Sequence, residues 1–157
     1  YQADSVFLEI LDSIGVSLDW ANEGLIVKKS SNIKLIDHDC SACPDLTPTL
    51  AFMAAHIDGE SVLRNLEILR YKESDRIEEI IKVLKAFDVP FRFDQEKEDL
   101  YINGSSKIRY PNIDYNPPAD HRIIMMTYLF MIKNSGGNIS NTDHIKKSFP
   151  HFIEVFS

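Results

Sequence analysis

The segment Ile77–Ile102, IEEIIKVLKAFDVPFRFDQEKEDLYI, changes its hydrophobic period from helical to alternating within one stretch. Its first part places apolar residues at helical spacing: Ile77, Ile80, Ile81, Leu84 and Phe87. After Asp88 the residues of Val89–Phe93 alternate, Asp94–Asp99 reads as a turn, and Leu100–Ile102 returns as a strand. The pattern predicts a helix followed by a β-hairpin.

The same pattern occurs at the start of the chain, about 73–75 residues earlier. Apolar residues in Val6–Ile14 follow helical spacing, and Gly15, a typical C-cap residue, stands where Asp88 stands in the later copy. Val16–Trp20 then alternates, and after a glycine-containing turn Leu25–Val27 returns as a second strand. The chain therefore contains an internal repeat, although the two copies share few identical residues.

A second type of unit separates the two copies. Ile33–Ile36 reads as a strand, Pro48–Ile57 as a helix closed by Gly59, and Ser61–Leu66 as a strand. The last third repeats this order of strand, helix, strand and helix: Lys107–Tyr110, His121–Lys133, Asn138–Ser140 and Phe149–Phe156. These elements predict an α/β chain of repeated strand–helix–strand–helix–strand–strand units, with the opening strand and helix of the first unit upstream of the chain.

The composition is that of an ordinary globular protein: 157 residues, 44% of them hydrophobic and 26% charged. This length suits one domain with a real core, and no apolar run approaches the roughly 18 residues of a membrane span. Tyr1–Ser5 has neither the charged start nor the apolar run of a signal peptide, and the chain does not begin with Met. We therefore expect a cytoplasmic piece of a longer protein.

The formal net charge is −7, from 17 Lys and Arg against 24 Asp and Glu. A protein this acidic is not suited to coat nucleic acid or an anionic membrane surface. It can still bind small anions where its cations gather, so the positions of the cations are more informative than their sum.

Cys40 and Cys43 form a Cys-x-x-Cys pair, which occurs both in redox motifs and in zinc sites. Zinc would need two further ligands, and the sequence has no second cluster of this kind. A redox motif usually opens a helix after a strand, whereas Pro44 and Asp45 intervene here. Two reduced thiols without a chemical role, as in many cytoplasmic proteins, are the simpler interpretation, and we expect no metal.

Two segments place charged residues at the start of a predicted helix. Asp45 precedes Thr47, which suits an N-cap, and Pro48, which suits the first helical position. Asp75 can cap the next helix, with Glu78 as its capping-box partner. The alternatives that involve no ligand are a turn aspartate in the first case and a solvated, charge-mixed helix start in the second.

A third such segment is Asp120–Arg122, in which Asp120 is a suitable N-cap and the helix that follows is apolar almost all round. A helix of this kind is buried, so its opening histidine and arginine are candidates for function, with a structural ion pair as the competing explanation. Helix N-termini favour phosphate and carboxylate ligands. If the three helix starts meet, their cations form one anion site: Lys72, Arg76 and Arg122, with Lys147 as a weaker fourth member.

Four runs of the chain resemble the EPSP synthases (3-phosphoshikimate 1-carboxyvinyltransferases): Pro44–Thr49, Leu69–Arg76, Asp120–Arg122 and Lys147–Pro150. They occur in the family's order over nearly the whole chain, and the combination of Lys-Glu-Ser-Asp-Arg with Asp-His-Arg is highly specific. The resemblance implies βαβαββ units of the enolpyruvyl-transferase type, an inside-out α/β barrel. Residues 1–157 would form most of the C-terminal of two globular halves, and the N-terminal half would lie outside the chain.

The resemblance also implies a reaction. The enolpyruvyl group of phosphoenolpyruvate passes to the 5-hydroxyl of shikimate 3-phosphate through a tetrahedral intermediate, and phosphate is released without a metal or organic cofactor. Asp45 corresponds to the carboxylate that serves as general base at the 5-hydroxyl. Glu73 corresponds to the proton donor and acceptor at the methylene carbon, and Lys72 to a lysine that contacts the shikimate phosphate and assists proton transfer.

Three cations, Arg76, Arg122 and Lys147, correspond to those that hold phosphoenolpyruvate in the family. Arginine suits this task because its planar guanidinium matches carboxylate and phosphate geometry. His121 is expected to orient the site without taking a chemical step. We expect a monomer whose partners are the two substrates and the missing N-terminal half.

The chain departs from the family at Ile68, where some members carry a polar residue that contacts the shikimate phosphate, and at Ile124, where the family often has a small residue. The related UDP-N-acetylglucosamine enolpyruvyl transferase has the same fold and donor, but the Lys-Glu-Ser-Asp-Arg run argues against it. A non-catalytic anion-binding or scaffold module is the alternative of a different class. Because the family's other half supplies further residues to both substrate sites, we expect the chain alone to be inactive.

Overall fold

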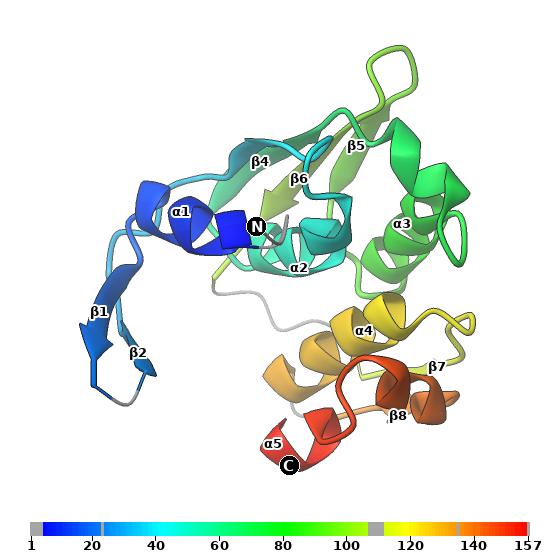
Figure 1. The fold of residues 1–157 in the computed structure, drawn as a ribbon. Helices are drawn as coiled ribbons and strands as arrows, with labels where there is room; N and C mark the ends of the chain where they lie inside the picture. Colours follow the sequence, from blue (N-terminus) through cyan, green and yellow to red (C-terminus); the bar gives the residue numbers. More distant parts are fainter. Residues whose placement is uncertain (1–4, 23, 107–111, 135, 157) are drawn as a thin grey trace.

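The chain is described here from a computed structural model, which covers residues 5–22, 24–106, 112–134 and 136–156. Its centre is one complete βαβαββ unit, and Figure 1 labels its elements in chain order: β3 (Asp37–Asp39), α2 (Thr47–Ala55), β4 (Gly59–Arg64), α3 (Arg76–Ala86), β5 (Phe91–Asp94) and β6 (Asp99–Gly104). The four strands form one sheet in the order β3-β4-β6-β5. β3 and β4 are parallel, and the other two pairs are antiparallel. The predicted α/β repeat is confirmed.

Incomplete units flank the central one. At the start of the chain, α1 (Val6–Ser13) leads into the antiparallel hairpin of β1 (Ser17–Ala21) and β2 (Gly24–Lys28). The last third consists of one strand pair and two helices: β7 (Asp114–Tyr115), α4 (His121–Lys133), β8 (Asn138–Ile139) and α5 (Phe152–Phe156). β7 and β8 are parallel, as β3 and β4 are. None of the described helices is both long and apolar enough to cross a membrane.

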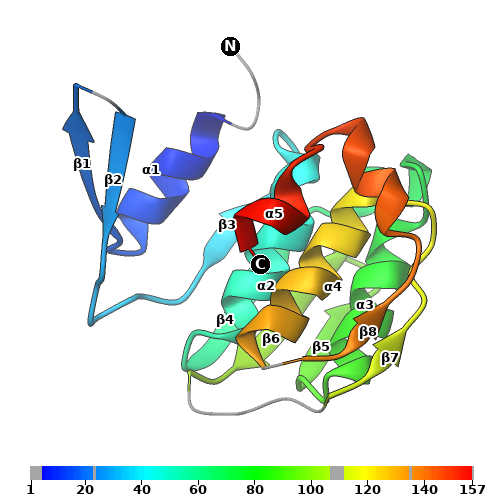
Figure 2. The same ribbon diagram turned by 90° about the horizontal axis from the view of Figure 1, so that it is seen from below.

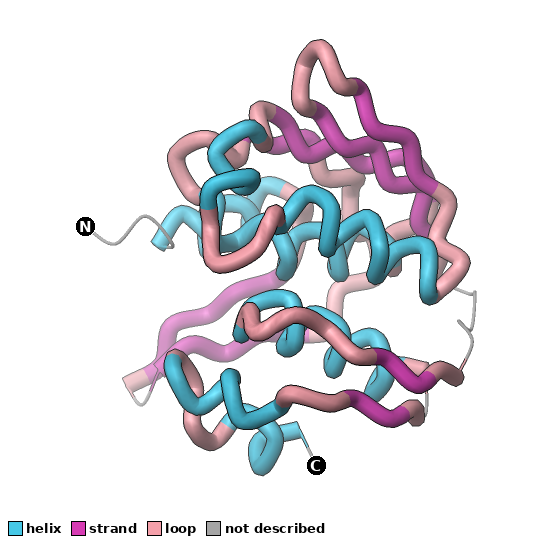
Figure 3. The backbone as a smooth tube through the Cα atoms, turned by 90° about the vertical axis from the view of Figure 1, so that its right-hand side faces the viewer, coloured by secondary structure: helices cyan, strands magenta, loops and turns pink. Residues whose placement is uncertain are grey.

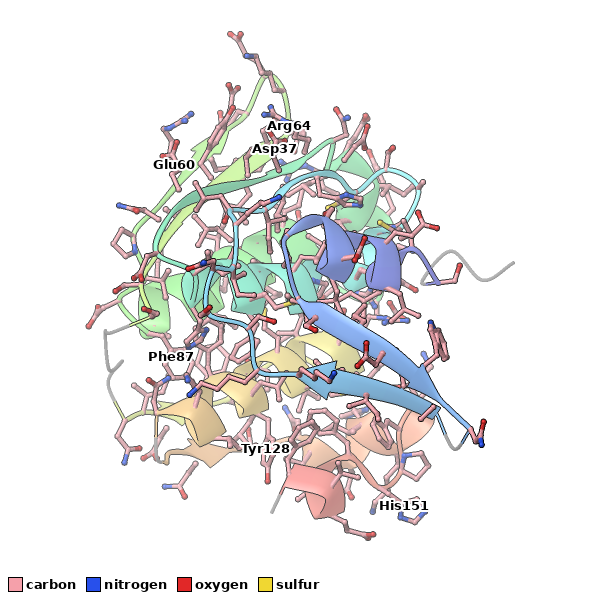
Figure 4. All side chains as sticks on the ribbon, turned by 90° about the vertical axis from the view of Figure 1, so that its left-hand side faces the viewer. Asp37, Glu60, Arg64, Phe87, Tyr128 and His151 are labelled. Carbon is pink, nitrogen blue, oxygen red and sulfur yellow. The ribbon has the colours of Figure 1, made fainter. Side chains whose placement is uncertain are left out.

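The elements form layers with a continuous apolar core between them. Figure 3 shows the four-stranded sheet at one side, α2 and α3 along its inner face, and α4 between these helices and the β7–β8 pair. Leu63 and Leu100 of the sheet and Leu84 of α3 are fully buried. Phe130 of α4 stacks on Phe87 with 4.8 Å between ring centroids. The outer face of the sheet is polar, and Arg64 and Asp37 form an ion pair there, labelled in Figure 4.

The αββ repeat extends to the backbone conformation of single residues. Gly15 follows α1 with φ +88°, and Asp88 follows α3 with φ +53°. Gly15 N donates to Asp12 O, and Asp88 N donates to Lys85 O. Both helices therefore end in a left-handed residue, and the prediction that Asp88 takes the place of Gly15 is confirmed.

The βαβα repeat also extends to side-chain contacts. Asn65 follows β4 with φ +58°, and Asn141 follows β8 with φ +61°. Asn65 Nδ2 donates to Asp39 across the β3–β4 pair (2.8 Å), and Asn141 Nδ2 donates to Asn116 across the β7–β8 pair (3.1 Å). Asparagine tolerates this conformation better than most residues do. These two positions are therefore equivalent in the central and C-terminal units.

Three sequence predictions about element positions were wrong. The strand expected at Ile33–Ile36 lies at Asp37–Asp39, because the pairing of β3 with Val62–Arg64 sets its position. Thr47 does not cap α2, because a 3₁₀ turn, η2 (Pro44–Leu46), leads directly into the helix and Thr47 is fully buried. Pro48 does occupy the first turn as expected.

The C-terminal helix was predicted too long. The expected range Phe149–Phe156 contains Pro150, and α5 begins only at Phe152. Two further 3₁₀ helices, η3 (Glu67–Tyr71) and η4 (Thr142–Lys147), were not predicted. The strand expected at residues 107–110 lies outside the described residues.

Candidate active site

The predicted site residues come from four segments that precede or begin a helix, and the structure brings them together. Asp45 lies in η2, ahead of α2, and Lys147 ends η4. The segment after η3 and the start of α4 supply the remaining members: Lys72, Glu73, Arg76, Asp120, His121 and Arg122. Ion pairs and hydrogen bonds described below connect all four segments. The expected convergence of the helix starts is therefore present.

Arg76 is at the centre of this cluster. Its side chain is only 1% exposed and lies among three carboxylates. The guanidinium donates to Asp120 from Nε (2.8 Å), to Asp45 from Nη1 (2.7 Å) and to Glu73 from Nη2 (2.5 Å). Burial lowers the pKa of Arg76, but the hydrogen bonds and charge of Asp120 outweigh burial and leave the pKa raised. Arg76 is thus a permanent buried cation.

Asp45 receives cations from three directions. Arg122 Nη1 donates to its backbone O and Arg122 Nη2 to Oδ2, both at 3.1 Å. Lys72 Nζ lies 3.2 Å from Oδ1, the oxygen that Arg76 also contacts. Burial raises the pKa of Asp45, but Arg122, Arg76 and Lys72 together bring it below the ordinary aspartate value. Asp45 is therefore an ionised carboxylate in this arrangement.

Glu73 is the second candidate for proton transfer. A backbone N–H of Glu73 itself lowers the pKa of its carboxyl most, burial opposes this, and Arg76 lowers the pKa further. Lys147 Nζ approaches Glu73 Oε1 at 3.6 Å. Two carboxylates in one site were expected to hold separated pKa values, but here the pKa values of Asp45 and Glu73 are both lowered.

Asp120 has a larger structural role than the N-cap predicted for it. The cap is present, since Oδ1 accepts from Arg122 N at 3.0 Å. The fully buried carboxylate also accepts from Arg76, and Ser74 Oγ donates to Oδ2 at 3.0 Å. Sequence reasoning treated Ser74 only as part of a motif. The signal for Asp120 was its position at the start of a helix that is apolar on nearly all sides.

His121 lies beside this cluster and is 7% exposed. Burial lowers the pKa of its imidazole, and the charge of Arg122 lowers it further. Ile124, one turn into α4, is fully buried and packs with Ile145 and Phe152, so the larger residue at this position is accommodated by the C-terminal segment. Ile68 is 46% exposed.

The two cysteines lie just before Asp45, and both are buried. Burial raises the pKa of the Cys40 thiol to about 12, so this thiol stays protonated at neutral pH. His38 Nε2 lies 3.3 Å from Cys43 Sγ. The described residues hold no group of three or more His, Cys, Asp or Glu side chains placed to bind a metal ion.

A family model for EPSP synthase (3-phosphoshikimate 1-carboxyvinyltransferase) matches residues 1–156. The chain belongs to the EPSP synthase family. Among its curated relatives, the 3-phosphoshikimate 1-carboxyvinyltransferase of Syntrophobacter fumaroxidans is 36% identical over 155 residues, and that of Methanosarcina acetivorans is 32% identical over 158. Each alignment covers 99% of this chain and 36% of the relative. This member of the EPSP synthase family therefore spans about a third of its relatives' length.

Solved structures agree with this assignment. EPSP synthase from Acinetobacter baumannii superposes with a TM-score of 0.76 at 26% identity, covering 99% of this chain and 38% of that one. The enolpyruvyl transferase NikO from Streptomyces tendae superposes with a TM-score of 0.72 over 96% of this chain and 34% of its own, at 16% identity. The second similarity shows that the fold alone extends beyond EPSP synthases, so the fold does not define the acceptor.

Proposed function

We propose that residues 1–157 form most of the C-terminal half of an enzyme that transfers the enolpyruvyl group of phosphoenolpyruvate to the 5-hydroxyl of shikimate 3-phosphate. The observation that carries the proposal is the cluster of Asp45, Lys72, Glu73, Arg76, Arg122 and Lys147 in one place, on a chain whose family has this activity. Four cations there suit substrates that carry two phosphates and a carboxylate.

The proposed chemistry balances around one carbon. Asp45 removes the proton of the 5-hydroxyl, whose oxygen attacks C2 of phosphoenolpyruvate while Glu73 protonates the methylene carbon. Removal of a proton from the resulting methyl group by Glu73 then expels phosphate and restores the double bond. Lys72 contacts the shikimate phosphate and assists proton transfer, and His121 orients the site. General acid–base steps of this kind need two groups at different protonation states.

Binding of phosphoenolpyruvate offers a physical route to that difference. Arg76 and Lys147, which now contact Glu73, are proposed to bind the incoming anion together with Arg122. A carboxylate that loses cationic partners and gains an anionic neighbour has its pKa raised. We infer that the bound substrate converts Glu73 from a carboxylate into a proton donor.

The test uses the full-length protein that contains this chain, with phosphate release measured in the presence of both substrates. Arg122→Ala is expected to raise KM for phosphoenolpyruvate by at least about tenfold, because it removes charge-assisted hydrogen bonds. Arg92→Ala is the matched control, since Arg92 is an exposed arginine that pairs with Glu60 on the sheet. No phosphate release by the full-length protein, or equal KM changes in both variants, would overturn the proposal.

A further inference from the structure

The strand pair of the C-terminal unit has an open edge where the central unit has a bound hairpin. In the central unit β4 pairs with β3 on one side and with β6 on the other, with Leu63 opposite Leu100 and Ser61 opposite Ile102. Among the described residues, β8 pairs with β7 alone. The equivalence of Asn65 and Asn141 places Ile139 where Leu63 lies.

The start of the chain has the opposite deficiency. In the α1–β1–β2 segment Trp20 lies opposite Leu25 and Leu18 opposite Val27, just as Phe93 lies opposite Leu100 and Phe91 opposite Ile102 in the central unit. β2 therefore corresponds to β6, but in the described part of the chain it pairs only with β1. The hairpin supplies the very elements that the C-terminal unit lacks.

Burial agrees with this reading of the hairpin. Leu100 and Ile102 of β6 are completely buried, whereas Val27 is 59% exposed and Trp20 is 75% exposed. Leu18, Trp20, Leu25 and Val27 share one face of the hairpin, because side chains two residues apart point to the same side. An apolar face on an open strand edge is a surface for strand addition.

A groove of matching character runs beside β8. It has a volume of about 320 Å³ and is lined by α4 and β8 residues: Tyr128, Met131, Ile132, Gly136, Gly137 and Ile139. Ile132 is 41% exposed in this groove. In the central unit the end of α2 is covered at the corresponding place, where Ser105 N, just after β6, donates to Ala55 O at 3.1 Å and Ala55 is fully buried.

We propose that the β1–β2 hairpin of one copy of this chain adds to β8 of a second copy, antiparallel, with Leu25 opposite Ile139 and Val27 opposite Gly137. Figures 1 and 2 both place the hairpin and β8 on opposite sides of the molecule, so the acceptor is another copy. The contact is head-to-tail and leaves one free hairpin and one free β8 edge at the ends of each assembly. It rests on the fold and goes beyond the proposed enzymatic function.

The charges at the contact are compatible with pairing. In the central unit Asp99 at the start of β6 pairs with Arg64 at the end of β4 (3.2 Å). In the proposed contact the equivalent positions are Gly24 and Ser140, so neither partner of that ion pair is present alone. Burial of an unpaired charge, which would oppose association, is avoided at this end of the strands.

The experiment is sedimentation velocity of the 157-residue chain from micromolar to millimolar concentration. Val27→Lys blocks the hairpin, because it puts a charge on the face to be buried, and Ile132→Lys blocks the groove in the same way. Both side chains are exposed, so each variant is expected to fold. Ile68→Lys is the matched control, since Ile68 is a 46% exposed isoleucine in η3, outside both surfaces.

The unmodified chain and Ile68→Lys are expected to associate with rising concentration, and each blocked variant alone is expected to stay monomeric. A mixture of the two blocked variants is expected to form a dimer that does not grow, because each supplies the surface the other retains. A monomeric unmodified chain throughout the range would overturn the proposal, as would a mixture that stays monomeric. Self-association of Ile132→Lys would show hairpin-to-hairpin pairing and would also overturn it.

Discussion

At the residue scale, Arg76 is the most constrained group in the molecule. A buried charge is tolerated only when its hydrogen bonds are satisfied, and this guanidinium meets that condition through Asp45, Glu73 and Asp120 from three separate segments. The same contacts that hold the segments together also gather Arg122 and Lys147 at one place. Structural stability and the proposed anion site therefore depend on one network.

The proposed proton transfer by Glu73 predicts the effect of Glu73→Gln in the full-length protein. Glutamine keeps an oxygen for Arg76 but cannot exchange a proton with the methylene carbon, so kcat is expected to fall by about 10²–10⁴-fold. Steady-state phosphate release measures the loss, and an unchanged Tm shows that the fold is intact. Glu78→Gln, an exposed change one turn into α3, serves as control. Near-normal kcat for Glu73→Gln would contradict the assignment.

The Asp120–Arg76 pair predicts a pH-dependent loss of stability in Asp120→Asn. Asparagine can still cap α4, but the variant loses the negative charge and should be destabilised at neutral pH by roughly 3–5 kcal/mol. Burial raises the pKa of Asp120, and Arg76 lowers it further than burial raises it. A lowered pKa stabilises the fold above the unfolded value of about 3.9, and this contribution is lost as the pH falls through the folded pKa.

Urea unfolding of both proteins across this pH range measures the effect. The difference in unfolding free energy should be largest near neutrality and should shrink below about pH 4. The exposed pair of Asp143 and Lys146 provides the control, because Asp143→Asn changes a solvated ion pair of little energetic value. A difference that is constant with pH would mean that the charge of Asp120 contributes nothing.

At the scale of elements, the repeats show how one backbone solution is reached with different residues. The ends of α1 and α3 both need a residue in the left-handed region, which Gly15 adopts without strain and Asp88 adopts at a cost. The strand β3 shows the limit of this kind of reasoning from patterns. Its residues Asp37–Asp39 are polar, so only their pairing with β4 identifies them as a strand.

The two helix ends predict opposite effects for a matched pair of substitutions. Gly15→Ala should destabilise the chain by about 1 kcal/mol or more, because Ala is strained at this φ and its Cβ would lie 3.3 Å from Asn32 O. Asp88→Gly should stabilise it by up to about 1 kcal/mol, since Asp88 is exposed and glycine removes the strain. Thermal unfolding of the two variants measures both, and shifts of the same sign would contradict the equivalence.

At the scale of the whole molecule, the N-terminal ends of α2, α3 and α4 meet at one edge of the layered core. Each helix belongs to a βαβ segment, and the short segments before the helices bring Asp45, Glu73 and Arg122 together. The chain nevertheless spans only about a third of the length of its curated relatives. The proposed substrates carry more phosphate and carboxylate oxygens than this one cluster surrounds.

The incomplete site predicts that the 157-residue chain alone releases no phosphate from the two substrates. Adding the separately produced remainder of the protein should restore activity, provided that the two parts associate. The chain carrying Asp45→Asn, mixed with the same remainder, should restore none and controls for activity of the remainder itself. Steady-state turnover by the 157-residue chain alone would contradict the prediction.

The printed sequence was sufficient to predict the helices, the hairpin of β5 and β6, and the αββ repeat, because hydrophobic periodicity records which face of an element is buried. Motif resemblance was sufficient for the family and for the candidate residues. Only the tertiary structure showed that Arg76 is buried among three carboxylates and that Ser74 donates to Asp120. It also showed that β8 and β2 each have an edge open among the described residues. Such features depend on contacts between residues distant in the chain, and local periodicity contains no information about them.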